Sequence, residues 1–375
     1  MHAGDRRLER LADLDPRDEL LSMRPAELET SLTGWLAERG EPCYRVAQIV
    51  DAVYRHGATG WAAITTLPID LRTQLETDYR FPSIAPHEGR ESADGTRKFL
   101  WKLVDGESVE SVLIPTRRRD TICISSQVGC PLACAFCATG VFGYRRNLTA
   151  GEIVDQARRL RVLRGRSNVG MNVVFMGMGE PLLNWSPVAT ALDILIDPRG
   201  LDLGARRITV STVGVPEGMV ALGERFPQVR LAVSLHAARD EVRDKIVPLN
   251  RRHPLRELIA ACRVWGESTG KRLSFEYVHL PGVNDAVADA VALAELLKRV
   301  PAKVNLMRYN PVEGLGFRRP TEAETMTFRD AITDLTQSAI TIRKSRGIDI
   351  EGACGQLRLA HEAGAVVAEI GGLTS

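Results

Sequence analysis

Three cysteines in one short segment have the spacing that most clearly indicates chemistry. They stand in Cys130-Pro-Leu-Ala-Cys134-Ala-Phe-Cys137, a C-x3-C-x2-C pattern. Three thiolates at this spacing can bind three irons of a cubane iron–sulfur cluster and leave the fourth iron open to a ligand. A structural zinc site normally takes four protein ligands, often in two C-x2-C pairs, and no second pair follows. A zinc site completed by a distant Cys or His, and a chance grouping of buried cysteines, are the alternatives.

Four further cysteines are scattered through the chain, which has seven in all. Cys123 falls on an expected strand just before the cluster segment, and Cys354 lies among glycine and alanine residues, which favours an accessible loop. Composition alone would make either one a small buried hydrophobe. Cys43 and Cys262 occur in helical apolar patterns and are expected to be structural. Because no export signal precedes them, metal or redox chemistry is a better interpretation of these cysteines than a disulfide framework.

Small and polar residues follow several of the expected strands. In Met176-Gly-Met-Gly179-Glu180-Pro, small residues would let the backbone approach a ligand, and Glu180 could accept a hydrogen bond from an ammonium group. Polar residues at three later strand ends could bind ribose, carboxylate or adenine, although each alone is more often a turn or cap residue. The later candidates are Ser211, Thr212, Ser234, Leu235, His236 and Asn310. Their shared position at strand ends predicts one ligand pocket.

The elements that must position these residues alternate between short β-rich runs and longer helical runs. Expected strands are 122–126, 172–176, 208–211, 231–235, 274–278, 304–307 and 340–342; expected helices are near 150–164, 186–197, 254–268, 286–299 and 323–337. Capping boxes begin two of these helices, at Thr149 and Thr321. Repeated βα units indicate a parallel sheet under helices. We therefore predict an α/β fold, a partial TIM-like (β/α)6 barrel with its chemistry at the C-terminal strand ends.

The rest of the chain is expected to flank this barrel. We predict a flexible tail at 1–21, a helical accessory domain at 22–90, a β-hairpin linker and barrel extension at 91–120, the barrel at 121–360 and a second tail at 361–375. Asp105-Gly106 is the tight-turn signal of the hairpin.

Charge and hydropathy limit the class of protein. The chain of 375 residues is 44% hydrophobic, has a net charge of +2, and contains no run approaching the roughly 20 apolar residues of a membrane helix. The charged N-terminus does not resemble a secretory signal, so we expect a cytoplasmic protein without a membrane partner. Arginines gather between residues 117 and 166 and could neutralise phosphates, although a solvated helix face is the alternative. They are Arg117, Arg118, Arg119, Arg145, Arg146, Arg158, Arg159, Arg161, Arg164 and Arg166.

Taken together, these motifs resemble the RlmN/Cfr family of radical S-adenosylmethionine RNA adenine methyltransferases, over about residues 25–360. The resemblance is carried by the segments 123–140, 147–153, 177–184, 234–236 and 353–357. It implies a [4Fe-4S] cluster on Cys130, Cys134 and Cys137, with S-adenosylmethionine bound at the open iron. The residues implied to surround that cofactor are Gly179, Glu180, Ser211, Ser234, Leu235, His236 and Asn310.

The resemblance also implies a mechanism that uses two S-adenosylmethionine molecules per turnover. One methylates Cys354, and the second is cleaved to a radical that takes hydrogen from that methyl group. The resulting methylene adds to an adenine carbon, Glu110 accepts the ring proton, and Cys123 releases the product by forming a transient disulfide with Cys354. Without the family, Glu110 would be interpreted as a solvent-facing carboxylate of the hairpin.

The implied substrate is an adenine of 23S ribosomal RNA at the peptidyl-transferase centre, and in the C2 branch also an adenine beside the anticodon of some tRNAs. We expect methylation at C2, an electron donor such as flavodoxin, and a monomer. The alternatives are C8 methylation of the Cfr type, which confers antibiotic resistance, a non-catalytic iron–sulfur RNA-binding protein, and a radical enzyme acting on a small molecule. Two departures affect the expected pocket lining. Arg308 stands where the family often has Pro, and Val141-Phe142 replaces a more polar pair.

Overall fold

The computed structural model describes residue 15 and residues 17–165 and 169–357. The tail expected at 361–375 and Arg166 therefore lie outside the described residues, as does most of the tail expected at 1–21. The described part of that first segment is paired and buried. β1 (Asp18–Glu19) runs parallel to β2 (Tyr79–Arg80), and Leu20 and Leu21 are fully buried. Residues 18–22 thus differ from the loose tail that the charged sequence suggested.

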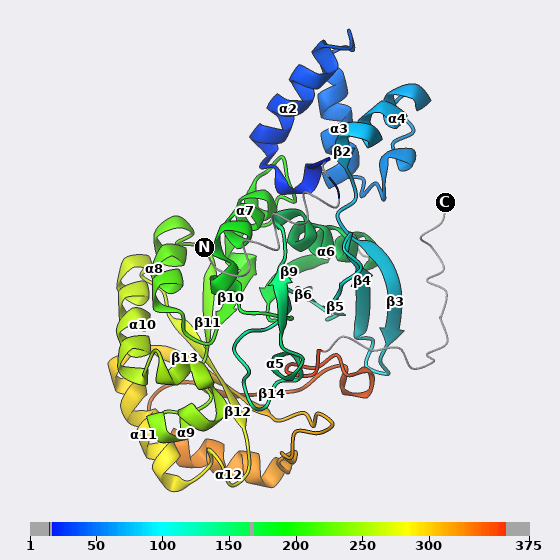
Figure 1. Ribbon diagram of the computed structural model, residues 1–375. Coiled ribbons are helices and arrows are strands. Elements are labelled where there is room, and N and C mark those ends of the chain that lie inside the picture. The colour runs from blue at the N-terminus through cyan, green and yellow to red at the C-terminus, as the bar shows by residue number, and fades with distance from the viewer. Residues whose placement is uncertain (1–14, 16, 166–168, 358–375) are drawn as a thin grey trace.

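Three helices form a unit at one end of the molecule (Figure 1). They are α2 (Pro25–Ala37), α3 (Tyr44–Tyr54) and α4 (Ile69–Asp78). The indole N–H of Trp35 donates to Asp78 at 2.6 Å, which ties the first helix to the last. Cys43 precedes α3 and is exposed, so it lies outside the helical apolar pattern in which it was expected to be structural. Cys262 is buried as expected.

A ten-stranded sheet forms the centre of the protein (Figure 1). Its parallel part is β6 (Arg119–Cys123), β9 (Gly170–Phe175), β10 (Ile208–Thr212), β11 (Arg230–Ser234), β12 (Leu273–His279), β13 (Ala302–Arg308) and β14 (Ile340–Arg343). An antiparallel extension of β3 (Ala85–Glu91), β4 (Arg97–Lys102) and β5 (Ser108–Ile114) joins at β6. The predicted hairpin is β4–β5; β3 was missed because it is mostly exposed, contains a proline and a glycine, and shifts register after Pro86.

Helices between consecutive parallel strands cover one face of the sheet. They are α6 (Ala150–Leu163), α7 (Trp185–Ile196), α8 (Pro216–Arg225), α10 (Leu255–Thr269), α11 (Val287–Arg299) and α12 (Glu322–Thr333). Both predicted capping boxes are present, on α6 and α12. Six such β/α units followed by β14 confirm the predicted partial barrel. No described helix is long and apolar enough to cross a membrane.

Two short helices and α8 were not predicted from the sequence. α5 (Ala138–Val141) and α9 (Asp240–Ile246) are each only one or two turns long. α8 contains two glycines, which lower helix propensity. A Cβ on Gly218 would lie 2.7 Å from Leu182, and one on Gly223 would lie 3.0 Å from Trp265. Close packing therefore selects glycine against local propensity.

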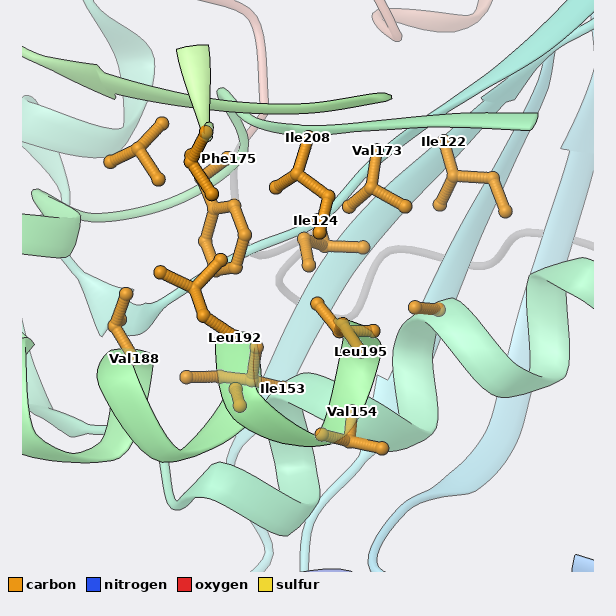
Figure 2. Packing of buried hydrophobic residues seen from close by; sticks show 14 of the residues in the cluster. Ile122, Ile124, Ile153, Val154, Val173, Phe175, Val188, Leu192, Leu195 and Ile208 are labelled. Atoms are coloured by element: carbon orange, nitrogen blue, oxygen red, sulfur yellow. The ribbon is translucent and has the colours of Figure 1, made fainter. Parts of the chain in front are cut away.

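The core lies between the sheet and the covering helices. Figure 2 shows strand residues facing α6 and α7, and all of the labelled side chains are fully buried or nearly so. The labelled strand-side residues include Ile122, Ile124, Val173, Phe175 and Ile208; the helix-side residues are Ile153, Val154, Val188, Leu192 and Leu195. Each such side chain contributes about 1.5–3 kcal/mol by leaving water. This rigid layer fixes the strand ends from which the site is built.

Three arginines of the expected phosphate-binding patch are buried in this fold. Arg146 pairs with Glu152 at 2.7 Å, and Arg158 pairs with Asp155 at 2.7 Å. Arg159 is also buried and lies 3.4 Å from Asp155. These three arginines are therefore not available to bind phosphate, because their guanidinium groups pair with acidic residues of α6 and do not face solvent.

Candidate active site

The C-x3-C-x2-C segment lies in the loop that connects the two strands of a small hairpin. β7 (Gln127–Gly129) pairs with β8 (Tyr144–Asn147), and a Cβ on Gly129 would collide with the carbonyl of Gly143. Within the loop, the Cys137 N–H donates to the Cys134 carbonyl at 3.1 Å. Cys130, Cys134 and Cys137 line one cavity of about 390 Å³, called the cysteine cavity below.

The chemistry of this donor set fits a cubane cluster. All three cysteines are free thiols, and burial raises the pKa of Cys130 to about 12 and that of Cys134 well above its usual value. Such thiols lose their protons when a metal binds. Within the described ranges no three metal-ligating side chains could hold a single ion. A cubane does not need them to, since each thiolate binds a different iron. The predicted cluster ligands are thus together in one cavity.

Glu180 is a buried carboxylate that faces the same cavity. Its two oxygens accept from the backbone N–H groups of Leu182 at 3.1 Å and Val213 at 2.8 Å. Burial raises the pKa of Glu180 to about 7, although these hydrogen bonds favour the charged form. An ammonium group in the cavity would stabilise this carboxylate, as expected for an amino-acid ligand.

The glycines before Glu180 are required by packing as well. A Cβ on Gly179, whose φ is +100°, would lie 2.6 Å from the Gln127 side chain, and one on Gly177 would lie 2.7 Å from the carbonyl of Ile124. From the sequence, we interpreted these glycines as allowing the backbone to approach a ligand closely. The structure adds that the loop is pressed against the end of β6.

Serines at two neighbouring strand ends lie side by side in the cavity. The hydroxyls of Ser211 and Ser234 are 3.4 Å apart, and both residues line the cavity. Leu235 is different, because its side chain is fully buried in the core and does not line the cavity. Its backbone N–H is already used, donating to the Glu276 carbonyl at 3.0 Å. Leu235 therefore contributes to the site through the position of its backbone.

His236 lies in the cavity as a neutral ring. Its Nδ1 accepts from the Val278 N–H at 3.1 Å, which leaves the Nε2 proton as a donor. Burial, with a smaller effect of Arg243, lowers the pKa of His236 to about 3. The ring stands edge-on to Phe136 at 4.6 Å between centroids. His236 thus connects the cluster loop to β11 and β12.

The loop that carries Cys354 is attached directly to the cluster loop. The Ala138 N–H donates to the Gly355 carbonyl at 2.8 Å, and the Thr139 hydroxyl donates to the Leu357 carbonyl at 2.7 Å. Cys354 is open to the cysteine cavity, whose walls surround and partly desolvate its thiol. The two segments, more than 200 residues apart, therefore share one cavity.

The end of β13 holds the same loop from the other side. The Asn310 amide donates to the Cys354 carbonyl at 3.4 Å, and Gln356 donates to the Pro311 carbonyl at 3.0 Å. Arg319 donates to the Asn310 oxygen at 2.7 Å, which fixes the orientation of that amide. Asn310 lines the cavity as predicted, and it acts in this structure as a support for the Cys354 loop.

Arg343 and Glu276 are site residues that the sequence interpretation missed. Both line the cysteine cavity together with Cys123 and Cys354. An Nη of Arg343 donates to Glu276 at 3.3 Å, and the other Glu276 oxygen accepts from Asn305 at 2.7 Å. Burial raises the pKa of both thiols, and the Arg343 charge opposes that rise. The signal in the sequence that could have identified Arg343 and Glu276 was their position on strands, where they were expected to face the inside of the barrel.

Glu110 is the one predicted catalytic residue that the structure places apart. It is not among the described residues that line the cysteine cavity. It lines a separate small void, where Lys98 lies 3.0 Å from its carboxylate and both side chains are buried. Its backbone carbonyl accepts from the Ser125 hydroxyl at 2.6 Å. Val112, two residues further along β5 and on the same strand face, does line the cavity. Glu110 is therefore the next residue along that face, just outside the cavity lining.

Comparisons with known proteins agree with this geometry. Residues 124–294 match the model of the radical SAM superfamily. A dual-specificity RNA methyltransferase RlmN from Pelobacter propionicus is 46% identical over 88% of this chain and 93% of its own length. A second such protein, from Geobacter sulfurreducens, is 45% identical over 92% and 93%. The crystal structure of a radical SAM methyltransferase from Sphaerobacter thermophilus superposes with a TM-score of 0.86 and 44% identity, over 91% of this chain and 99% of that one.

The barrel and its three-cysteine loop define a radical SAM protein, a class that carries a [4Fe-4S] cluster and S-adenosylmethionine. Within that class, the identity over nearly the whole chain shows that this protein belongs to the RlmN family.

Proposed function

We propose that this protein methylates C2 of an adenine in 23S ribosomal RNA, and of an adenine beside the anticodon in tRNA. The observation that carries the proposal is that Cys354 and Cys123 open into the same cavity as the three cluster cysteines. A binding protein needs neither extra thiol. The relatives named above are RNA methyltransferases of dual specificity, which supports RNA as the substrate.

In the proposed reaction, Cys130, Cys134 and Cys137 hold the cluster, and Glu180, Ser211, Ser234 and His236 surround the S-adenosylmethionine. When bound, this pair supplies the methyl group and, from a second S-adenosylmethionine, the hydrogen-abstracting radical. Cys354 accepts the methyl group and carries it to the adenine. Glu110 accepts the ring proton, and Cys123 displaces the product from Cys354.

Arg343 has a defined task in this scheme. Methyl transfer by displacement requires a thiolate, and burial disfavours the thiolate of Cys354. The guanidinium of Arg343 beside both thiols offsets part of that penalty. The same charge favours the Cys123 thiolate that attacks in the release step.

Basic side chains at the rim of the cavity support a polyanionic substrate. Arg308, Lys344 and Arg346 line the cavity, and among the described residues none of them has an ion-pair partner. Arg308, at the position where the family often has Pro, thus adds a cation where the substrate enters. The target base must leave its stack to reach the cavity. We further propose a cytoplasmic monomer that receives electrons from a donor such as flavodoxin.

Mass spectrometry of ribosomal RNA and tRNA tests this function. Each RNA is incubated anaerobically with the cluster-loaded protein, S-adenosylmethionine and a reductant. We expect 2-methyladenosine from the wild-type protein and none from Cys354→Ala. With Cys123→Ala we expect RNA that stays covalently attached to Cys354. Cys262→Ser, a buried cysteine outside the cavity, is the matched control and retains activity. 8-Methyladenosine would assign the C8 reaction, and methylation by Cys354→Ala would contradict the mechanism.

A further inference from the structure

A second cavity opens at the N-terminal end of the barrel strands, opposite the end that carries the cysteines. It has a volume of about 620 Å³ and is called the basic mouth below. Its charged lining consists of six cations and one carboxylate, Glu276. The cations are Arg206, Arg230, Lys271, Arg272, Lys303 and Arg343.

The alternation of side chains along the strands places Arg230, Lys303 and Arg343 on the inward-facing side of the barrel. The other three cations flank the beginnings of the strands, and most of the six are exposed at the mouth. On β11, Arg230 lines the basic mouth and Ser234, four residues on, lines the cysteine cavity. On β13, Lys303 and Met307 divide in the same way. Residues separated by an even number face the same side of a strand, so both ends belong to one inward-facing row. A closed barrel fills this space with branched apolar side chains, whereas here it is charged and open.

Most of this positive charge has no counterion in the structure. Arg343 is paired with Glu276, at 3.3 Å. None of the other five cations has an ion-pair partner in the part of the chain that the structure describes. Arg206 and Lys271 instead share one neutral acceptor, the Gln228 amide oxygen, at 2.9 and 3.1 Å.

Mutual repulsion among the cations follows from this arrangement. Burial, together with the charges of Arg206 and Arg230, lowers the pKa of Lys271. Several like charges around one concave surface raise the positive potential within it. An anion bound there would remove the repulsion.

We propose that the basic mouth binds a small phosphate-bearing anion. Guanidinium forks and ammonium groups are the donors that recognise phosphate oxygens, and the cavity volume lies within the range of small-molecule sites. The anion enters from the opposite end of the barrel from the RNA, so both can be bound together. This inference does not depend on the methyl-transfer chemistry. Four residues line both cavities, the apolar Val174 and Met176 and the charged Glu276 and Arg343.

Titration calorimetry of the full-length, cluster-loaded protein with inorganic pyrophosphate and with orthophosphate tests the proposal. We expect saturable binding that Arg230→Gln combined with Lys303→Gln weakens about tenfold or more, since both variants remove a charged hydrogen-bond donor to the anion. Arg252→Gln combined with Arg256→Gln is the charge-matched control, because both arginines are exposed and neither lines the mouth. That control should change the Kd by less than about twofold, because salt screens the effect of exposed charges that lie away from the mouth. Lys303→Arg should retain binding.

Three outcomes would overturn the proposal. One is the absence of saturable binding by either anion, and another is an equal loss of affinity in the mouth and control variants. The third is binding of a short RNA together with no binding of either free anion, which would assign the mouth to nucleic acid. Adenine methylation measured in the same samples reports separately on the proposed function, so failure of one does not imply failure of the other.

Discussion

Lys98 is the residue that most directly tests the assignment of Glu110. Its ammonium lies 3.0 Å from the buried Glu110 carboxylate. Removing Lys98 takes a positive charge away from the buried carboxylate, and the loss of one member of a buried pair is typically destabilising. The Glu110 carboxyl should then hold its proton more tightly and become a poorer proton acceptor near neutral pH. We expect Lys98→Met to slow methylation and raising the pH to restore part of the rate.

The measurement is the pH profile of the single-turnover methylation rate. Lys102→Met is the matched control, because Lys102 is on the same strand but exposed, donating to the carbonyl of Gly106. It should leave both rate and profile unchanged. A wild-type profile for Lys98→Met would show that Glu110 is a structural carboxylate.

At the level of single residues, the sequence was informative where residue type itself carries the chemistry. Thiols at cluster spacing and polar residues at strand ends could be predicted, and the structure brings most of them to one cavity. The arginine residue type did not reveal its environment: Arg146 and Arg158 were candidates for phosphate binding or a solvated face, yet both are buried in ion pairs. Arg343 carries no motif, and its role became visible only through its neighbours.

Among the secondary-structure elements, α6 connects the barrel to the N-terminal helices. Its Asp155 accepts from the backbone N–H groups of Ser83 at 3.0 Å and Ile84 at 3.1 Å. The neighbouring Arg158 donates to the carbonyl of Ala58 and pairs with Asp155. α6 thus satisfies polar groups of segments that come before the barrel in the chain. Periodicity predicted the helix, but these long-range partners have no local signal.

Asp155→Asn should therefore destabilise the whole protein by about 3–5 kcal/mol, because it leaves two buried guanidinium groups without their anion. Burial alone would raise the pKa of Asp155, but Arg158, Arg159 and the backbone donors outweigh it and lower the pKa. A lowered carboxyl pKa contributes stability above the unfolded value near 3.8 and loses it as the pH falls through the folded value.

Urea unfolding at pH 7 and at about pH 3 measures both effects. The difference in the free energy of unfolding between wild type and Asp155→Asn should be smaller at the lower pH. Asp51→Asn, in an exposed pair with Arg55, is the control and should change stability by less than about 1 kcal/mol. Equal stability of Asp155→Asn and wild type at pH 7 would show that α6 does not hold the N-terminal helices through this carboxylate.

For the whole molecule, the fold could be predicted more completely than the distribution of charge. The βα alternation is a local, periodic property, and it gave the partial barrel with its strand ends in order. Among the missed elements, α8 has glycines that are explained by close packing against residues elsewhere in the chain. A net charge of +2 concealed two separate positive regions, because surface cations are distinguished from buried ones only by folding.

The rim of the cysteine cavity and the basic mouth should differ in how they affect RNA binding. If Arg308, Lys344 and Arg346 contact phosphates, each cation replaced by Gln should reduce the slope of log affinity against log salt by about 0.7–0.9. Filter binding of a tRNA over a range of salt concentrations measures this slope. Arg230→Gln combined with Lys303→Gln should leave it unchanged, since those residues open at the other end of the barrel. Equal reductions from both sets would mean that RNA reaches both ends, and the separation of substrate site from anion site would have to be given up.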